Sequence, residues 1–204
     1  MRNFTRLILA VALVSTAVFV SACGSRDARY NTETQYIGGN VGSSPEPTRA
    51  SFDTVSYWDG DGVTGAPSIR ISLGEQRAYF YKGGELVGVS TISSGQEGHD
   101  TTTGNFKIIQ KSINHKSNLY GDYVDEAGNV IQKEVDVRKD KKPPGAKFDG
   151  AKMPYFMRIV GGIGIHAGFL PGYPASHGCI RMPEFMADAF FRNVELGTPV
   201  TVTL

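Results

Sequence analysis

The sequence predicts a mainly β domain with one short helix near its C-terminal end. Short runs of alternating apolar and polar residues recur between residues 68 and 204, and glycine or proline separates them. Such period-two runs are typical of half-buried strands, whereas only one segment repeats its apolar residues at helical spacing. Residues 67–204 provide about 138 positions, enough for one domain with its own core.

The strands begin at residue 68, where Ile69, Ile71 and Leu73 alternate with polar residues. Gly83-Gly84 separates the next two runs and predicts a hairpin turn. Residues 122–137 predict a second hairpin around Ala127-Gly128-Asn129. The remaining strand candidates are residues 78–81, 86–92, 106–109, 153–160, 163–166 and 198–204.

One segment, Pro183 to Val194, predicts the helix. Proline suits the first turn, where its missing N–H is not needed, and Glu184 favours the positive end of the helix dipole. The apolar face of the helix consists of Phe185, Met186, Ala189, Phe190 and Val194.

Residues 138–152 predict a loop rather than a strand or helix, because they contain Pro143-Pro144 and many charges. The basic residues in it are Arg138, Lys139, Lys141, Lys142, Lys147 and Lys152. Two interpretations fit this composition, a solvated surface loop and a lid that meets an anionic substrate.

The first 22 residues predict an export signal. Two arginines precede an apolar run of 14 residues, Leu7 to Val20, which is shorter than the roughly 18 to 20 residues of a spanning helix. Cys23 directly follows two small residues, a pattern that resembles the cleavage site of bacterial lipoproteins. We expect an acylated Cys23 as the first mature residue and as a membrane anchor. The alternative is an ordinary signal peptide with Cys23 as a bystander.

Residues 23–66 predict a flexible, lipid-anchored tether, because small and polar residues with proline dominate this stretch. Its aromatic residues, Tyr57 and Trp58 among them, are candidates to dock on the domain. Gly24, rather than an aspartate, favours sorting to the outer membrane if the host has two membranes, so we expect an extracytoplasmic, periplasmic protein. Without residues 1–22 the formal net charge falls from +1 to −1, which indicates no nucleic-acid partner.

Cys179 is expected to be the only thiol of the mature chain, because lipid consumes Cys23. A histidine and a glycine directly precede it, which is uncommon in a buried strand. A nearby imidazole can take the thiol proton and hold the thiolate in an ion pair. His166 and His177 are both close in sequence, and His177 would share one strand face with Cys179, so the residues alone leave the choice of base open.

These motifs resemble the L,D-transpeptidase catalytic domain, also called the YkuD domain, over the C-terminal two-thirds of the chain. Ile165-His166 and the segment Ser176 to Arg181 are similar to the family signature in order and approximate spacing, with Arg181 where many members have asparagine. Thr103 to Phe106 resembles the family's strand entry, and Met153 to Arg158 resembles the strand that leads to the first histidine. The resemblance implies a YkuD-like β-sandwich of mixed sheets.

The resemblance also implies a role for individual residues. Cys179 would be the nucleophile and His166 the base, with the carbonyl of Ala167 accepting the other imidazole N–H. The backbone N–H groups of His177, Gly178 and Cys179 would bind a developing oxyanion.

Three further residues are expected to bind substrate or to brace the loop, namely Ser176, Arg181 and Tyr155. For Arg181 the implied partner is a substrate carboxylate. The resemblance implies no cofactor and no metal ion.

The implied reaction is acyl transfer on peptidoglycan stem peptides. Cys179 would attack the carbonyl of the L-centre of the third residue, usually a diamino acid, and expel the terminal D-alanine to leave a thioester. An amine of a second stem would then form a cross-link, whereas water would make the enzyme a carboxypeptidase or hydrolase. Carbapenem-type β-lactams are expected to acylate the same thiol, and the protein is expected to be a monomer.

Two further classes compete with this interpretation. His166, His177 and Cys179 would make a metal site with an open fourth position, although the sequence offers no second cysteine pair or HExxH helix. A non-catalytic, wall-binding lipoprotein would keep the fold, but it would be expected to lose Cys179 or His166.

Overall fold

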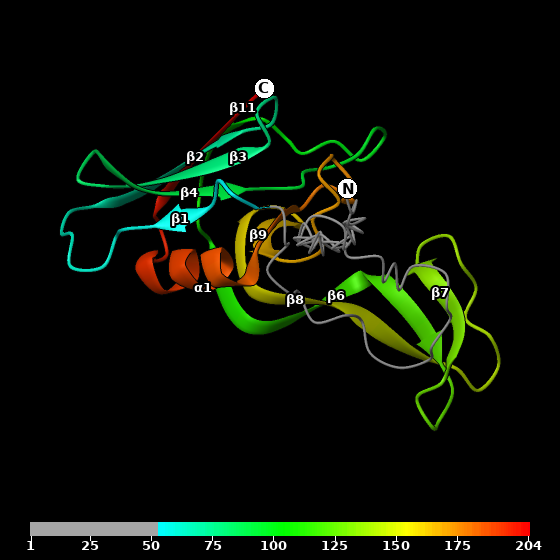
Figure 1. The fold of residues 1–204 in the computed structure, drawn as a ribbon. Helices are drawn as coiled ribbons and strands as arrows, with labels where there is room; N and C mark the ends of the chain where they lie inside the picture. Colours follow the sequence, from blue (N-terminus) through cyan, green and yellow to red (C-terminus); the bar gives the residue numbers. More distant parts are fainter. Residues whose placement is uncertain (1–52) are drawn as a thin grey trace, which may run out of the picture. The chain divides into compact units, whose positions relative to one another are not determined.

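Residues 53–204 are described in a computed structural model of the chain. The expected signal peptide, Cys23 and the tether up to residue 52 lie outside the described residues. Two β-sheets and one helix make up this part of the chain and pack on a common core (Figure 1). The predicted mainly β fold with mixed sheets is thereby confirmed.

The first sheet has its strands in the order β1-β4-β3-β2-β11-β5. Their bounds are β1 (Tyr57–Trp58), β2 (Pro67–Ser72), β3 (Arg77–Lys82), β4 (Glu85–Thr91), β5 (Gly104–Lys107) and β11 (Pro199–Thr203). Neighbours are antiparallel except β2 and β11, which run parallel with Val200 opposite Ile69. Gly83-Gly84 joins β3 to β4 with positive φ at both residues, which the two-residue hairpin turn requires and glycine allows.

The second sheet has its strands in the order β10-β9-β8-β6-β7. Their bounds are β6 (Gln110–Val124), β7 (Val130–Asp136), β8 (Lys147–Val160), β9 (Ile163–Ala167) and β10 (Ile180–Met182). Only β9 and β10 run parallel in this sheet. Strand β9 contains His166, and β10 begins directly after Cys179.

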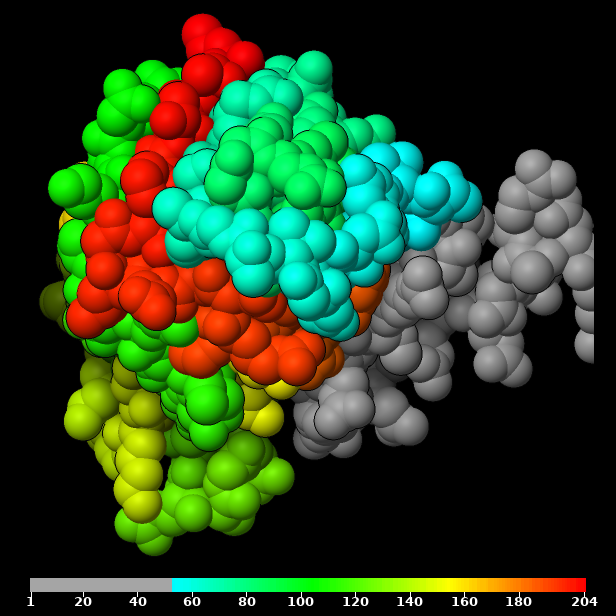
Figure 2. All heavy atoms as spheres, turned by 90° about the vertical axis from the view of Figure 1, so that its left-hand side faces the viewer, coloured from blue at the N-terminus to red at the C-terminus, as the bar shows by residue number. Residues whose placement is uncertain are grey.

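The core contains side chains from both sheets and from helix α1 (Glu184–Asn193). The largest fully buried ones include Phe80, Ile71, Phe156, Met157, Ile165, Ile180, Met186 and Phe190. Phe190 of α1 meets Phe80 of the first sheet edge-on, with ring centroids 4.9 Å apart, so the helix is held by aromatic packing. In Figure 2 the orange and red atoms of α1 lie directly below the cyan and green atoms of the first sheet.

Helix α1 is one residue shorter at each end than predicted, since Pro183 is its N-cap and Val194 its C-cap. It is the only α-helix within residues 53–204. None of the described residues forms a helix with the length and apolar character needed to cross a membrane.

The end of the expected tether belongs to the first sheet. Tyr57 and Trp58 pair with β4, and the Trp58 ring packs edge-on against Phe80 with centroids 5.1 Å apart. Burial of the large apolar indole surface favours this docking over a free chain. Tyr57 and Trp58, at the end of the expected tether, are thus docked on the domain, as their aromatic character indicated.

Strands β6 and β8 extend well beyond the core and carry β7 with them (Figure 1). We call residues 117–150, which form this extension, the flap. A register shift between Lys116 and Gly121 separates it from the rest of the sheet. The flap has its own small apolar cluster, formed by Tyr123, Val135 and Ala146 with Val137 and Phe148 against them.

Two segments differ from the prediction. Residues 110–121 had no predicted strand but form most of β6, because polar and exposed residues hide its strand pattern. Residues 147–152 were predicted as the end of the basic loop but belong to β8, where Lys116 of the paired strand holds Asp149 at 2.8 Å. The hairpin predicted within residues 122–137 is present, formed by β6 and β7.

Candidate active site

The parallel pairing of β9 and β10 sets the positions of the motif residues. Arg181 lies opposite His166, so Cys179, two residues earlier, comes next to Gly164. Residues that lie opposite each other, and residues two apart along a strand, point to the same face of a sheet. Cys179, His166 and Arg181 therefore converge on one face of the second sheet.

His166 is held in one tautomer. It is 5 % exposed, and its Nδ1 donates a hydrogen bond to the carbonyl of Ala167 at 2.8 Å. Because a carbonyl can only accept, Nδ1 carries the proton and Nε2 of the neutral ring is left as an acceptor. Burial lowers the pKa of His166 to about 4, against the opposing effect of the Ala167 hydrogen bond. His166 is thus a neutral imidazole at pH 7.

Phe156 and Gly164 shape the space around this imidazole. The Phe156 ring lies 6.2 Å from that of His166, measured between centroids, and stacks on His115 at 4.1 Å. A side chain at position 164 would place its Cβ only 2.4 Å from the Phe156 ring, so glycine is needed there. The bare backbone of Gly164 also leaves room for the thiol that lies beside it.

Cys179 has a partly exposed side chain whose thiol donates to the carbonyl of Gly162, with Sγ 3.6 Å from the oxygen. Burial raises the pKa of Cys179, and the N–H of Gly164 and the charge of Arg181 offset only part of this effect. The resting pair is therefore a neutral thiol beside a neutral imidazole. Burial thus disfavours the expected thiolate–imidazolium ion pair in the resting site, because it disfavours the charged form of both groups.

The backbone turns sharply just before Cys179. Gly178 has a φ of +105°, which strains any residue with a Cβ. Ser176 braces the turn with its buried hydroxyl, which accepts the N–H of Gly178 at 3.1 Å and donates to the carbonyl of Cys179 at 2.5 Å. Thr101, in the segment between β4 and β5, also stabilises the turn, because its hydroxyl donates a hydrogen bond to the Gly178 carbonyl at 2.9 Å.

This bonding changes the expected set of oxyanion donors. The Gly178 N–H is engaged by Ser176 and so does not point freely at a substrate. No hydrogen bond to an acceptor within residues 53–204 uses the backbone N–H groups of His177 and Cys179. These two groups are the donors that the turn leaves available.

His177 is exposed and belongs to an aromatic stack. Its ring lies nearly parallel to that of Tyr120, with centroids 4.3 Å apart and 16° between the planes, and edge-on to that of His99 at 4.6 Å. His177 does not share a strand face with Cys179, because β10 begins only at Ile180 and the turn at Gly178 breaks the alternation. Partial burial and the charge of His99 lower the pKa of His177.

Arg181 and Tyr155 have different surroundings. The aliphatic stem of Arg181 passes over Gly168, and no carboxylate within residues 53–204 forms an ion pair with its guanidinium. Tyr155 packs against Phe191 of α1, with ring centroids 5.9 Å apart. The structure thus brings Arg181 to the face that carries Cys179 and places the Tyr155 ring against the helix.

A family comparison covers the same part of the chain. The family model described as YkuD, the L,D-transpeptidase catalytic domain, matches residues 66–202. The chain belongs to this family.

Solved structures of L,D-transpeptidases have a similar fold. The L,D-transpeptidase LdtMt1 in complex with imipenem has a TM-score of 0.51 at 18 % identity, over 68 % of this chain and 59 % of that chain. The L,D-transpeptidase from Mycobacterium smegmatis has a TM-score of 0.51 at 16 % identity, over 68 % of this chain and 59 % of that chain. The L,D-transpeptidase from Xylanimonas cellulosilytica has a TM-score of 0.50 at 20 % identity, over 70 % of this chain and 62 % of that chain. The chain therefore spans about three fifths of each of these structures, and a comparison with curated proteins finds no match.

Within this YkuD domain the structure adds residues to which sequence reasoning assigned no role. Tyr120 and His99 stack around His177, and Arg158 lies on β8 opposite Gly164. They come from segments far from the two motifs, and only Arg158 stands in a stretch that resembles the family. Tyr120 and His99 give only a weak signal, namely a ring in a mostly polar segment, and Arg158 is a single charge in an apolar stretch of β8.

The described residues do not support the alternative hypothesis of a metal site. No group of three or more His, Cys, Asp or Glu side chains within residues 53–204 is arranged to hold a metal ion. His166, His177 and Cys179 therefore do not form the three-ligand set that the alternative requires, because His177 turns toward Tyr120 and His99.

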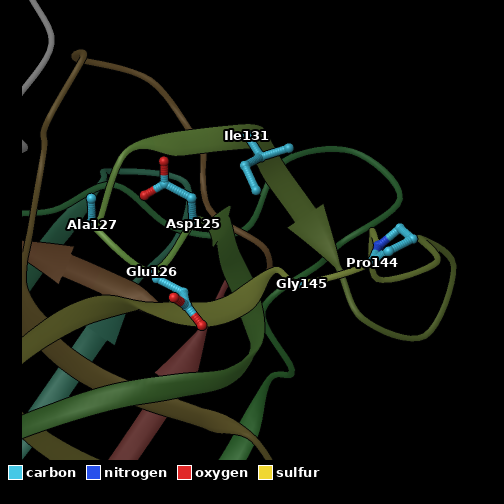
Figure 3. A pocket seen from close by; sticks show the side chains of 6 residues that line it. All are labelled: Asp125, Glu126, Ala127, Ile131, Pro144 and Gly145. Atoms are coloured by element: carbon cyan, nitrogen blue, oxygen red, sulfur yellow. The ribbon is translucent and has the colours of Figure 1, made fainter.

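Two hollows lie outside the face that carries Cys179. One, of about 410 Å³, is at the tip of the flap (Figure 3) and is lined by Asp125, Glu126, Ala127, Ile131, Pro144 and Gly145. The other, of about 570 Å³, is lined by parts of residues 73–76, 94–95 and 100–103, with Pro174 and Leu204. Neither hollow includes a cysteine or histidine, so neither contains the thiol chemistry of the YkuD domain.

Proposed function

We propose that the protein is a cysteine-dependent L,D-transpeptidase that acts on peptidoglycan stem peptides. The observation that carries the proposal is the placement of Cys179 and His166 on one face of neighbouring parallel strands, with His166 fixed by Ala167. This arrangement leaves Nε2 of the imidazole as the proton acceptor beside a thiol. A nucleophile, a base and a group that orients the base are the parts that thiol acyl transfer needs.

In the first half-reaction the Cys179 sulfur attacks the carbonyl of the L-centre of the third stem residue. The thiol proton passes to Nε2 of His166 as the S–C bond forms, because both groups are neutral at rest. The carbonyl oxygen becomes an oxyanion, for which the N–H groups of His177 and Cys179 are the available donors. The C–N bond then breaks, and the imidazolium returns its proton to the departing amine of D-alanine.

In the second half-reaction an acceptor amine attacks the thioester. His166 takes a proton from this amine, and the sulfur leaves and regains a proton as the thiol. The product is a cross-link between two stems. Water in place of the amine gives the carboxypeptidase reaction, which uses the same residues and differs only in access to the thioester.

The substrate places this reaction outside the cytoplasm, and we propose a lipid anchor on Cys23 with the tether behind it. The support is the sequence pattern of residues 1–23, which precede the described part of the chain. An anchored domain on a tether reaches the wall without leaving the membrane surface.

The test is product analysis with purified protein and disaccharide-tetrapeptide substrate. Mass spectrometry is expected to show release of D-alanine together with cross-linked dimers. Cys179→Ala is expected to abolish both products while circular dichroism and melting remain those of the wild type, because the change removes one sulfur from a partly exposed position. Wild-type turnover by the Ala variant contradicts the proposal, and D-alanine release without dimers assigns the carboxypeptidase reaction instead.

A further inference from the structure

Two arginines lie near Cys179, one on β8 and one on β10. Arg158 of β8 is opposite Gly164 of β9, and Gly164 is the neighbour of Cys179. Arg181 follows Cys179 by two residues along the chain, and the two groups act on each other's charge. Both positive charges act on the thiol, where each favours the ionised form.

Neither guanidinium has a counter-ion within residues 53–204. The ion pairs in this part of the chain join Lys116 to Asp149, Arg138 and Lys139 to Asp136, and Arg192 to Asp188. Arg181 is partly buried, and this burial lowers the pKa of its guanidinium. A partly buried charge without a partner is costly, and an anionic ligand removes that cost.

Arg158 is held in a defined position. Its Nε donates to the side-chain oxygen of Gln110 at 2.7 Å and its Nη1 to the carbonyl of Gly161 at 2.6 Å. The guanidinium also lies 5.0 Å from the centroid of the Phe156 ring. These contacts use Nε and Nη1, and no acceptor within residues 53–204 binds Nη2. An arginine that is already ordered loses little side-chain entropy when it binds an anion.

We propose that Arg158 and Arg181 together form a subsite that binds a carboxylate of the donor stem next to the scissile bond. This inference rests on the proposed function and adds the group that the site recognises. The donor offers the terminal carboxylate on the leaving D-alanine and, where the diamino acid is diaminopimelate, a second one on its D-centre. Guanidinium groups bind carboxylates by charge-assisted hydrogen bonds, and the charges of two of them act on the thiol here.

The experiment compares three donors, the tetrapeptide acid, its C-terminal amide and the analogue amidated on the diamino acid. The ratio of kcat/KM for the acid to that for each amide is measured in wild type and in Arg158→Gln. The wild type is expected to favour the acid over one of the two amides by about ten- to a hundredfold, the range of a hydrogen bond to a charged group. Arg158→Gln is expected to bring that ratio close to one, and Arg158→Lys is expected to restore part of it.

Arg192→Gln serves as the matched control, because it removes the same charge from an exposed position on α1. It is expected to keep the wild-type ratio. The amide that loses the preference identifies which carboxylate is bound. A ratio near one in wild type for both amides overturns the proposal, as does an equal loss of kcat/KM for acid and amides in Arg158→Gln, which would mark a merely structural arginine.

Binding to the Cys179→Ala variant separates this inference from the proposed reaction. Calorimetry is expected to show tighter binding of the acid than of the relevant amide, and no such difference once Arg158→Gln is added. Acid-selective binding without turnover by the wild type would keep the carboxylate subsite and reject the transpeptidase reaction. Equal binding of acid and amides in the presence of both arginines rejects the subsite.

Discussion

Tyr120 and His177 stack almost parallel, with ring centroids 4.3 Å apart. Tyr120 belongs to the flap, whereas His177 stands in the turn that presents Cys179. Arg138 holds the phenol by a hydrogen bond of 2.7 Å from Nη2 and is itself bound by Asp136 at 2.8 Å. One ring contact therefore couples the flap to the turn that carries the nucleophile.

Tyr120→Ala is expected to lower kcat/KM about three- to tenfold, because an aromatic pair contributes about 0.5–1.5 kcal/mol beyond its buried area. Tyr120→Phe keeps the ring and loses only the hydrogen bond from Arg138, so it is expected to lose less activity. Steady-state kinetics with a parallel melting curve measures both effects. A Phe variant as impaired as the Ala variant would show that the hydroxyl, and not the stack, is what matters.

His166→Ala and His177→Ala distinguish the two candidate bases. His166→Ala removes the proton acceptor, and a loss of about 10² to 10⁴ in rate is expected. His177→Ala is expected to cost less, because it removes the ring that stacks on Tyr120 and leaves Nε2 of His166 in place. Single-turnover acylation measures the chemical step for both variants. A larger loss in His177→Ala than in His166→Ala would reverse the assignment.

The pH dependence of kcat/KM follows from the environment of His166. Burial disfavours its charged form and lowers its pKa to about 4, so the base stays unprotonated well below the ordinary histidine value of about 6.5. The acid limb of the profile is expected near pH 4. An acid limb near pH 6.5 would argue that a better solvated histidine is the base.

The rate at which iodoacetamide alkylates Cys179 is expected to rise with pH, with a midpoint above the ordinary thiol pKa, since burial raises the pKa of this thiol.

Carbapenem-type β-lactams are expected to acylate Cys179 once. Their strained amide offers an electrophilic carbonyl to the same thiol and oxyanion donors as the stem peptide. Intact-mass spectrometry checks for a single adduct that Cys179→Ala lacks. Protein that turns over stem peptides but stays unmodified at high drug concentration would contradict this pocket geometry.

The lipid anchor has its own test in cells. A fatty-acid analogue with a clickable tag is expected to label the wild type and not Cys23→Ala, because acylation at that position is what the lipoprotein pattern predicts. Cys179→Ala is the matched control, since it removes the other cysteine and is expected to keep the label. Label that persists in Cys23→Ala would contradict the assignment.

Much of the fold was predictable because its strands pack one face on the core. The alternation of Ile69 and Ile71 with polar residues predicted β2, and the apolar face that includes Phe190 predicted α1. Strand β6 was not predicted, because most of its residues touch solvent and few of them are apolar, so its alternation is not visible in the sequence. Strand β10 was not predicted, because a segment of three residues is too short to show an alternating pattern.

The site was predictable only where it is local in sequence. His166, Ala167 and Cys179 stand in two motifs, and the hydrogen bond between the first two follows from neighbours in the chain. The contact of Tyr120 with His177 joins residues that only folding brings together. The upward shift of the thiol pKa was also not predictable, because it depends on burial rather than on residue type.

Strand β11 affects how this domain reaches its native state. It follows every other described element in the chain, yet it lies between β2 and β5 in the first sheet. Until residues 199–203 have been synthesised, β2 and β5 each keep an open edge that can pair with other chains. Such distant pairing makes folding slow and places it after synthesis of the domain. A fragment that lacks β11 is therefore expected to aggregate rather than to form a smaller stable domain.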